Sequence, residues 1–147
     1  MKVIRVSADP IDSVTDLVPL ASLGGGAVAS FTGIARDDNG VAAIELEHYP
    51  AMTESSLNAL MDEAFARWSL LGAILIHRVG IINVGEPIVV VGTAASHRAE
   101  ALEACAFLID RLKTDAPFWK KEHRADGSAI WVEAKSSDDA RADKWRD

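Results

Sequence analysis

The chain has 147 residues, of which 49% are hydrophobic and 25% are charged, and its formal net charge is −7. This length suits one domain over residues 1–147, and the apolar content is too high for a disordered protein. An acidic chain also lacks the broad basic face that nucleic-acid binding normally requires. Its only cysteine, Cys105, excludes an internal disulfide and a multi-cysteine metal site. The N-terminal sequence has no long apolar segment, so it predicts neither a signal peptide nor a membrane anchor, and we expect a cytoplasmic protein.

Strand and helix signals alternate along the first third of the chain. Residues 1–7 alternate apolar and polar side chains and predict a strand, after which Asp9 and Pro10 can begin a short helix towards Leu20. Residues 27–36 and 41–48 predict two further strands around the turn sequence Asp-Asp-Asn-Gly. These two strands can be joined as a hairpin or by a longer flexible connection.

The middle of the chain predicts an amphipathic helix followed by two strands. Thr53 can cap a helix that runs to about Leu71. One face of this helix carries large apolar side chains, namely Leu57, Leu60, Met61, Ala64 and Trp68. Residues 73–79 and 88–94 are rich in β-branched side chains and predict a second pair of strands around a turn.

The last predicted elements are a helix and two strands. Ser96 can cap a helix from His97 to about Lys113, which Pro117 prevents from continuing. Residues 118–123 and 129–134 predict strands around a turn.

Together the predicted elements include three helices, and strand pairs outnumber helical crossovers. This order favours an α+β domain with a mixed or antiparallel sheet over a doubly wound fold. The tail, residues 136–147, is highly charged, and we expect it to fray or to dock on a partner.

Lys113 and Lys120 are the candidate catalytic residues, because the Pro117 turn lets the chain fold both amines towards one pocket. In the simpler alternative, Lys113 complements the dipole at a helix C-terminus, worth about 0.3–1 kcal/mol, and Lys120 is solvated. In the functional alternative, clustered ammonium groups lower one another's pKa. A shift from about 10.4 to about 7.5 would correspond to roughly 4 kcal/mol of differential interaction. Such a lysine can act as a nucleophile or as an acid-base catalyst.

Three cationic side chains, Arg36, His97 and Arg98, are candidate ligands for an anion, and we refer to them as the anion residues. His97 and Arg98 begin the predicted third helix, where free backbone N–H groups and the helix dipole favour a phosphate. Arg36 lies at a strand end beside a loop. The alternative is that all three are simply solvated, since cations do not complement the dipole at a helix N-terminus.

The sequence predicts no metal site. The four histidines, His48, His77, His97 and His123, do not have the spacing of a known metal motif. The run Gly24-Gly25-Gly26 lacks the Lys-Ser/Thr that completes a P-loop, so it predicts an ordinary loop.

Six segments of the chain, in order, carry a family resemblance. They are FTGIAR (31–36), LEHYPAMTE (46–54), HRVG (77–80), SHR (96–98), LKTDAPFWKKE (112–122) and WVEA (131–134). Together they resemble the large, catalytic subunit family of molybdopterin synthases, and APFWK with its upstream lysine is the most specific part.

This resemblance implies an α/β-hammerhead-like α+β fold and a sulfurtransferase of molybdenum cofactor biosynthesis. The implied assembly is a homodimer at the centre of a heterotetramer. Its other component is a small ubiquitin-like sulfur-carrier subunit whose Gly-Gly C-terminus carries a thiocarboxylate. The implied substrate, cyclic pyranopterin monophosphate, gains two sulfurs as a dithiolene, and no cofactor is required.

The resemblance also assigns roles to individual residues. The catalytic lysines of the family fall on Lys113 and Lys120, and Lys120 also binds substrate. The substrate-binding residues fall on the three anion residues, with Arg36 expected to reach across the dimer. Supporting roles fall on Phe31, on Glu122, which could form an ion pair beside the lysines, and on Lys135. An arginine is common at this last position, and lysine cannot reproduce its bidentate geometry.

The implied mechanism begins when the thiocarboxylate sulfur attacks the pterin side chain. Water or Lys113 then releases the carboxyl end of the carrier, and a second carrier repeats the transfer. The sequence leaves open whether Lys113 forms a covalent adduct or acts as an acid-base catalyst. It also leaves two other functions open, a non-catalytic module that binds a ubiquitin-like tail or a phosphorylated ligand, and an acyl or phosphoryl transferase.

Overall fold

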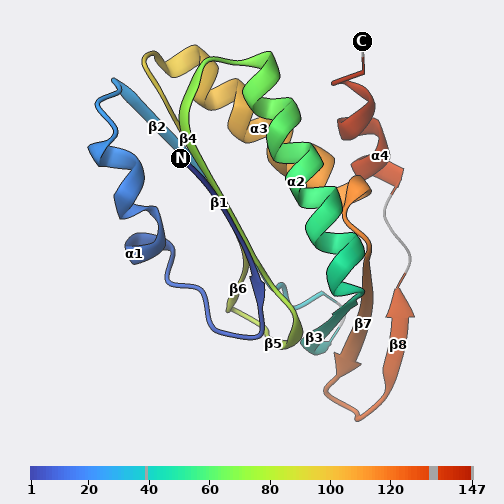
Figure 1. Ribbon diagram of the computed structural model, residues 1–147. Coiled ribbons are helices and arrows are strands. Elements are labelled where there is room, and N and C mark those ends of the chain that lie inside the picture. Colours follow the sequence, from blue (N-terminus) through green and yellow to red (C-terminus); the bar gives the residue numbers. More distant parts are fainter. Residues whose placement is uncertain (39, 133–135, 147) are drawn as a thin grey trace.

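The computed structural model describes residues 1–38, 40–132 and 136–146, and its strands form two four-stranded sheets (Figure 1). Sheet A contains, in spatial order, β1 (Lys2–Ser7), β4 (Leu70–Arg78), β6 (Pro87–Ala95) and β2 (Ala27–Ile34). Sheet B contains β5 (Gly80–Asn83), β3 (Val41–His48), β7 (Phe118–Arg124) and β8 (Ala129–Val132). The helices are α1 (Ser13–Leu17), the 3-10 helix η1 (Val18–Ser22), α2 (Pro50–Arg67), α3 (Arg98–Asp115) and α4 (Ser136–Asp143).

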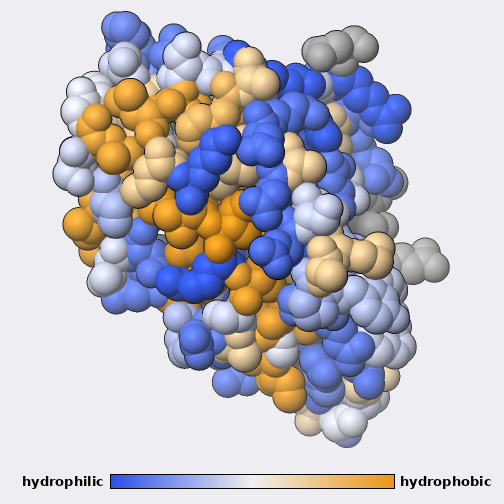
Figure 2. Space-filling model, viewed as in Figure 1, coloured by the Kyte–Doolittle hydropathy of each residue, from blue (hydrophilic) through white to orange (hydrophobic). Residues whose placement is uncertain are grey.

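Sheet A is covered on both faces, which explains why its central strands are almost entirely apolar. β1 joins β4 in parallel, whereas β6 is antiparallel to both β4 and β2, so the sheet is mixed. The helices α2 and α3 lie side by side over one face, and α1 with η1 covers the other (Figure 1). In the same view the outward side of α2 is mostly hydrophilic, whereas apolar residues reach the surface over α1 and η1 (Figure 2). Gly92 allows this second layer to pack closely, because a Cβ there would collide with Leu17 and Leu20.

Sheet B is antiparallel and lies beyond one end of sheet A. The chain passes from one sheet to the other between β4 and β5, where Gly80 has a φ of 80° that suits glycine. Ile44 and Leu46 of β3 form a small separate core with Ile82 of β5. Because β7 pairs with β3, its position relative to sheet A is fixed by this second core.

The predicted α+β class is confirmed, but the predicted hairpin of residues 27–36 and 41–48 is wrong. β2 pairs with β6 in sheet A, whereas β3 pairs with β5 and β7 in sheet B. The apolar side chains of the two strands are buried in different cores, so the loop between them connects the sheets and does not close a turn. The longer connection, the other sequence-based alternative, is therefore correct, and the short strand β5 was missed.

Three predicted helix caps are also wrong. Asp12, rather than Asp9, caps α1. α2 begins at Pro50, a favourable first helical residue, and Thr53 is buried with its Oγ1 3.1 Å from Nδ1 of His48. α3 has His97 as its N-cap, rather than Ser96, and continues to Asp115.

The charged tail forms a fourth helix, although the sequence predicted three, and its described part docks on the same chain. Ala142 of α4 is buried, and the indole of Trp145 lies 5.7 Å from the rings of both Phe107 and Trp68. The Trp145 Nε1–H donates to Asp110 Oδ2 at 2.8 Å. The prediction that this tail frays is therefore wrong, because two apolar residues of the charged segment, Ala142 and Trp145, pack against the rest of the chain.

Candidate active site

Lys113 lines a pocket of about 420 Å³ that runs along α3 beside the edge strand β2. One side of the pocket is a helical stripe from Leu102 to Lys113, and the other side includes Phe31 of β2. Asp138 and Arg141 of α4 complete the wall. The structure thus brings Lys113 and Phe31 together, as a shared site requires, and adds two α4 residues that sequence reasoning missed because the tail had no apolar period.

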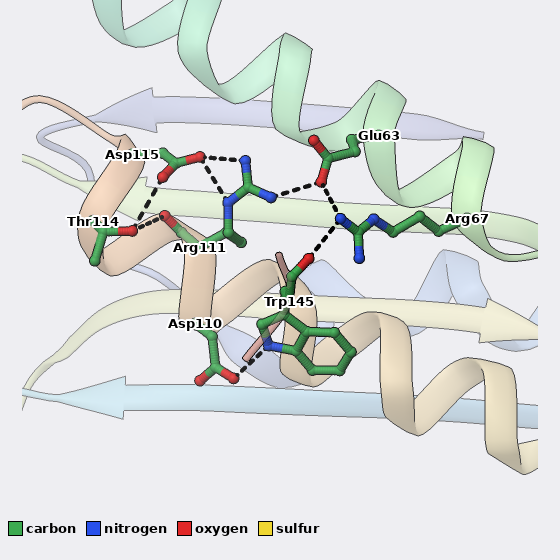
Figure 3. Close-up of polar contacts among 7 residues, drawn as sticks. All are labelled: Glu63, Arg67, Asp110, Arg111, Thr114, Asp115 and Trp145. Atoms are coloured by element: carbon green, nitrogen blue, oxygen red, sulfur yellow. Dashed lines mark hydrogen bonds and ion pairs between the residues drawn. The ribbon is translucent and has the colours of Figure 1, made fainter. Parts of the chain in front are cut away.

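A network of charged residues holds the last turn of α3 in place (Figure 3). Arg111 donates to Glu63 of α2 at 2.6 Å and to Asp115 at 2.7 Å. Hydrogen bonding to Asp115, and then to Glu63, raises the pKa of the Arg111 guanidinium. Arg67 links the same Glu63 to the backbone oxygen of Trp145 at 2.7 Å. Because α2, α3 and the C-terminal segment are joined here, the backbone that carries Lys113 is well anchored.

His77 is a buried histidine whose ionisation is affected by the charge of Lys113. The His77 ring stacks on Phe118 with ring centroids 4.1 Å apart, and its Nδ1 lies 2.8 Å from the Arg78 carbonyl oxygen. A carbonyl only accepts hydrogen bonds, so Nδ1 carries the proton. Burial is the main cause that lowers the pKa of His77 to about 4; the hydrogen bond to Arg78 opposes this shift, and the charges of Lys113 and His48 add to it. His77 is therefore neutral near pH 7 and adds no charge beside the lysine.

Lys120 and Glu122 project from the same face of β7 as Phe118, because side chains two residues apart in a strand share a face. They are half-buried and lie opposite Leu46 and Ile44 of β3. β7 begins directly after the Pro117 turn that follows α3, but Lys120 is not among the residues that line the Lys113 pocket. Glu122 pairs with Arg124 at 3.5 Å.

The three anion residues are exposed and do not lie together within one chain. Arg98 opens α3 and Lys113 is in its last turn, so a rise of about 1.5 Å per residue separates them by about 22 Å. The β2–β6 register shows the same arrangement, since Ala27 pairs with Ala95 at one end and Ile34 pairs with Pro87 at the other. Arg36 therefore lies at the Lys113 end of sheet A, and His97 and Arg98 lie at the opposite end.

The contacts of the anion residues are few. Arg36 pairs with Asp38 at 3.3 Å, and His97 Nδ1 lies 4.0 Å from a Glu100 carboxylate oxygen. No side chain caps the N-terminus of α3, so its first backbone N–H groups remain available to a ligand. Lys135, the other predicted supporting residue, lies outside the described residues.

Within residues 1–38, 40–132 and 136–146, no group of three or more His, Cys, Asp or Glu side chains could hold a metal ion. In the same residues, no helix combines the length and apolar character needed to cross a membrane. The cytoplasmic location stays a prediction. Cys105 lines the Lys113 pocket, but burial raises the pKa of its thiol to about 11, so very little thiolate exists near pH 7.

The fold and the pocket define a small α+β protein with a largely apolar pocket, whose charged lining residues are Lys113, Arg141, Asp110 and Asp138. The family model described as "MoaE protein" matches residues 6–115, and the chain belongs to this family. It is 47% identical over 145 residues to a molybdopterin synthase catalytic subunit of Cereibacter sphaeroides, covering 97% of this chain and 99% of that protein. The family predicted from the sequence is therefore confirmed.

Solved structures agree with this assignment. The molybdopterin biosynthesis MoaE protein from Burkholderia ambifaria is 44% identical, with a TM-score of 0.84 over 99% of this chain and 98% of that one. A structure of molybdopterin synthase from Staphylococcus aureus is 27% identical, with a TM-score of 0.80 over 88% of this chain and 96% of that one. The relatives carry the name of an enzyme, in line with the enzyme predicted from the sequence.

Proposed function

We propose that this chain is the catalytic subunit of a molybdopterin synthase. It transfers sulfur from the thiocarboxylated Gly-Gly C-terminus of a small ubiquitin-like subunit to cyclic pyranopterin monophosphate. The observation that carries the proposal is the pocket at the end of α3, which combines Lys113 with Phe31 in a member of the MoaE family. The name "catalytic subunit" of the Cereibacter relative also supports a further subunit as the partner.

In the proposed reaction, the carrier's thiocarboxylate sulfur forms a C–S bond at a side-chain carbon of the pterin, and the C–O bond at that carbon breaks, with the oxygen leaving as phosphate or water. Water or Lys113 then attacks the acyl carbon and breaks its bond to sulfur, which leaves the sulfur on the pterin. The carrier is released as a carboxylate, directly by water or after hydrolysis of an amide to Lys113. A second carrier repeats the transfer. Lys120 holds the anionic substrate and stabilises developing negative charge, an effect typically worth a few kcal/mol in a water-poor pocket.

The positions of the anion residues support a site shared between two copies of the chain. β2 is an edge strand with exposed apolar side chains at Val28, Phe31 and Ile34, and such an edge is suited to pairing with another strand. Antiparallel pairing of two β2 edges about a two-fold axis would bring the N-terminal end of one α3 beside the C-terminal end of the other. His97 and Arg98 of the partner subunit would then complete the site around Lys113 and Arg36. This differs from the sequence-based expectation that Arg36 crosses the dimer.

The carrier's tail enters the same pocket in extended form. Glycine suits a narrow channel, because a residue without a side chain lets the backbone approach the lysine closely. Ordering such a tail costs about 1–2 kcal/mol per residue, so the globular body of the carrier must bind elsewhere on the chain. We expect residues 136–147 to contribute to that docking face, since Asp138 and Arg141 already line the pocket.

The decisive experiment is incubation with cyclic pyranopterin monophosphate and thiocarboxylated carrier, scored for dithiolene product. Product formation that depends on the thiocarboxylate supports the proposal. Carrier binding without product would indicate a non-catalytic module, and turnover without a thiocarboxylated protein would indicate another transferase.

A further inference from the structure

Arg78 is a charged residue whose side chain is only 10% exposed, and the proposed reaction does not use it. It ends β4, next to His77. Its Nε–H donates to the Ala8 carbonyl oxygen at 3.2 Å, and its Nη1 donates to Glu86 Oε2 at 3.1 Å. A buried guanidinium is costly unless it is paired in this way, so these contacts indicate a specific structural purpose.

Glu86 closes a tight turn with its other carboxylate oxygen. Oε1 accepts from the Asn83 backbone N–H at 2.8 Å, and the Glu86 backbone N–H donates to the Asn83 carbonyl at 3.0 Å. Gly85 supplies the φ of 92° that this turn requires. The Asn83 hydrogen bond, and then the Arg78 side chain, lower the pKa of Glu86, so the carboxylate is ionised at neutral pH.

The same turn holds the residue that precedes Arg36. The Ala35 backbone N–H donates to the Glu86 carbonyl at 3.0 Å, and the Ala35 carbonyl accepts from the Gly85 N–H at 2.8 Å. Ala35 is 2% exposed, whereas the Arg36 side chain is 66% exposed. The backbone next to Arg36 is therefore held by the two hydrogen bonds of Ala35, although the Arg36 side chain extends into solvent.

We propose that the Arg78–Glu86 pair is a positioning device that fixes Ala35, and through it Arg36, at the edge of the active site. The inference rests on the proposed function, in which Arg36 binds the substrate anion. Ordering a long side chain on a mobile loop costs conformational entropy at the moment of binding, and a loop anchored beforehand reduces this cost. Neither Arg78 nor Glu86 lines the Lys113 pocket, so the proposed effect acts through the backbone at Arg36.

The first test measures backbone anchoring without any activity assay. In Glu86→Ala, hydrogen exchange at the Ala35 and Gly85 amides is expected to accelerate about tenfold or more, since hydrogen bonds to charged groups are the stronger ones. The control is Asp16→Ala, which removes a different arginine pair on sheet A, the 3.0 Å contact with Arg5. The control should leave both amides unchanged. Unchanged exchange in Glu86→Ala would overturn the anchor.

The second test is a double-mutant cycle on the enzyme. Glu86→Ala should raise KM for the pterin phosphate about five- to tenfold with little change in kcat, as expected for lost binding preorganisation. In an Arg36→Ala background the same substitution should have no further effect. An equal effect in both backgrounds would show that Glu86 acts by a route other than Arg36. If wild-type chain makes no dithiolene with competent carrier, the proposed function fails, and faster amide exchange would still support the anchor.

Discussion

Mixing two impaired variants within one dimer, at pterin concentrations well below KM, tests whether the active site uses residues from both copies. The perturbation combines an Arg98→Ala chain with a Lys113→Ala chain. Within one chain these residues are about 22 Å apart along α3, too far to hold one small substrate. In a two-fold dimer, however, each mixed molecule keeps one complete site, formed by Lys113 of the first chain and Arg98 of the partner subunit. Random mixing of equal amounts gives half mixed dimers, so about a quarter of wild-type activity should return.

The assay is dithiolene formation per dimer after co-expression of the two variants with different affinity tags. Dimers purified through both tags should reach about half of wild-type turnover, because one of their two sites is intact. The matched control mixes Arg36→Ala with Lys113→Ala. These residues lie at the same end of one chain, so no mixed dimer would hold a complete site. Failure of the first mixture to recover activity, or recovery in the control, would refute the proposed arrangement.

Four further predictions address single residues. Lys113→Ala should reduce turnover at least about a hundredfold and change the free energy of unfolding by no more than about 0.5 kcal/mol. Lys113→Arg should also be inactive, because a guanidinium stays protonated; a fully active Arg variant would leave Lys113 only an electrostatic role. Alanine at any of the three anion residues should raise KM for the pterin more than for the carrier, by a factor that shrinks in high salt, and equal losses would contradict the assigned pocket. In the folded chain His77 has a pKa of about 4, whereas in the unfolded chain it takes up its proton near pH 6.5. The free energy of unfolding should therefore fall by about 3 kcal/mol as the pH drops from 6.5 to 4. Urea unfolding should show a flatter pH dependence in His77→Asn, which keeps a donor for the Arg78 carbonyl, and an unchanged slope would exclude His77 as the titrating group. Trp145→Ala should cost about 2 kcal/mol, because it removes ring contacts and the bond to Asp110, and an unchanged urea midpoint would mean that α4 does not dock in solution.

Local sequence patterns correctly indicated most of the secondary structure. The apolar period that predicted a helix from Thr53 to about Leu71 correctly indicated α2, although that helix ends at Arg67 and Leu70 already begins β4. This period, the β-branched runs that became β4 and β6, and the stop at Pro117 each depend on neighbouring residues alone. Lys113 was also identified as a candidate from the sequence, because a lysine that ends a helix before a proline turn is visible as a local pattern. The family assignment depended on several short segments in fixed order.

The tertiary structure decided which strands pair in each sheet and where the C-terminal helix docks, because both depend on which apolar surfaces pack together. Residues 27–34 and 41–48 carry similar strand signals, yet they belong to different sheets because their side chains fill different cores. The docking of α4 depends on Trp145 reaching a cluster formed by residues far away in the sequence.

The same distinction holds for the site. The sequence indicated the anion residues as candidates. Only the length of α3 and the β2–β6 register showed that His97 and Arg98 lie at the end of α3 opposite to Lys113. The link from Arg78 through Glu86 to Ala35 joins three segments that no local pattern connects. Long-range pairing of this kind is chosen by complementary packing between distant surfaces, and sequence periodicity contains no information about which surface will be the partner.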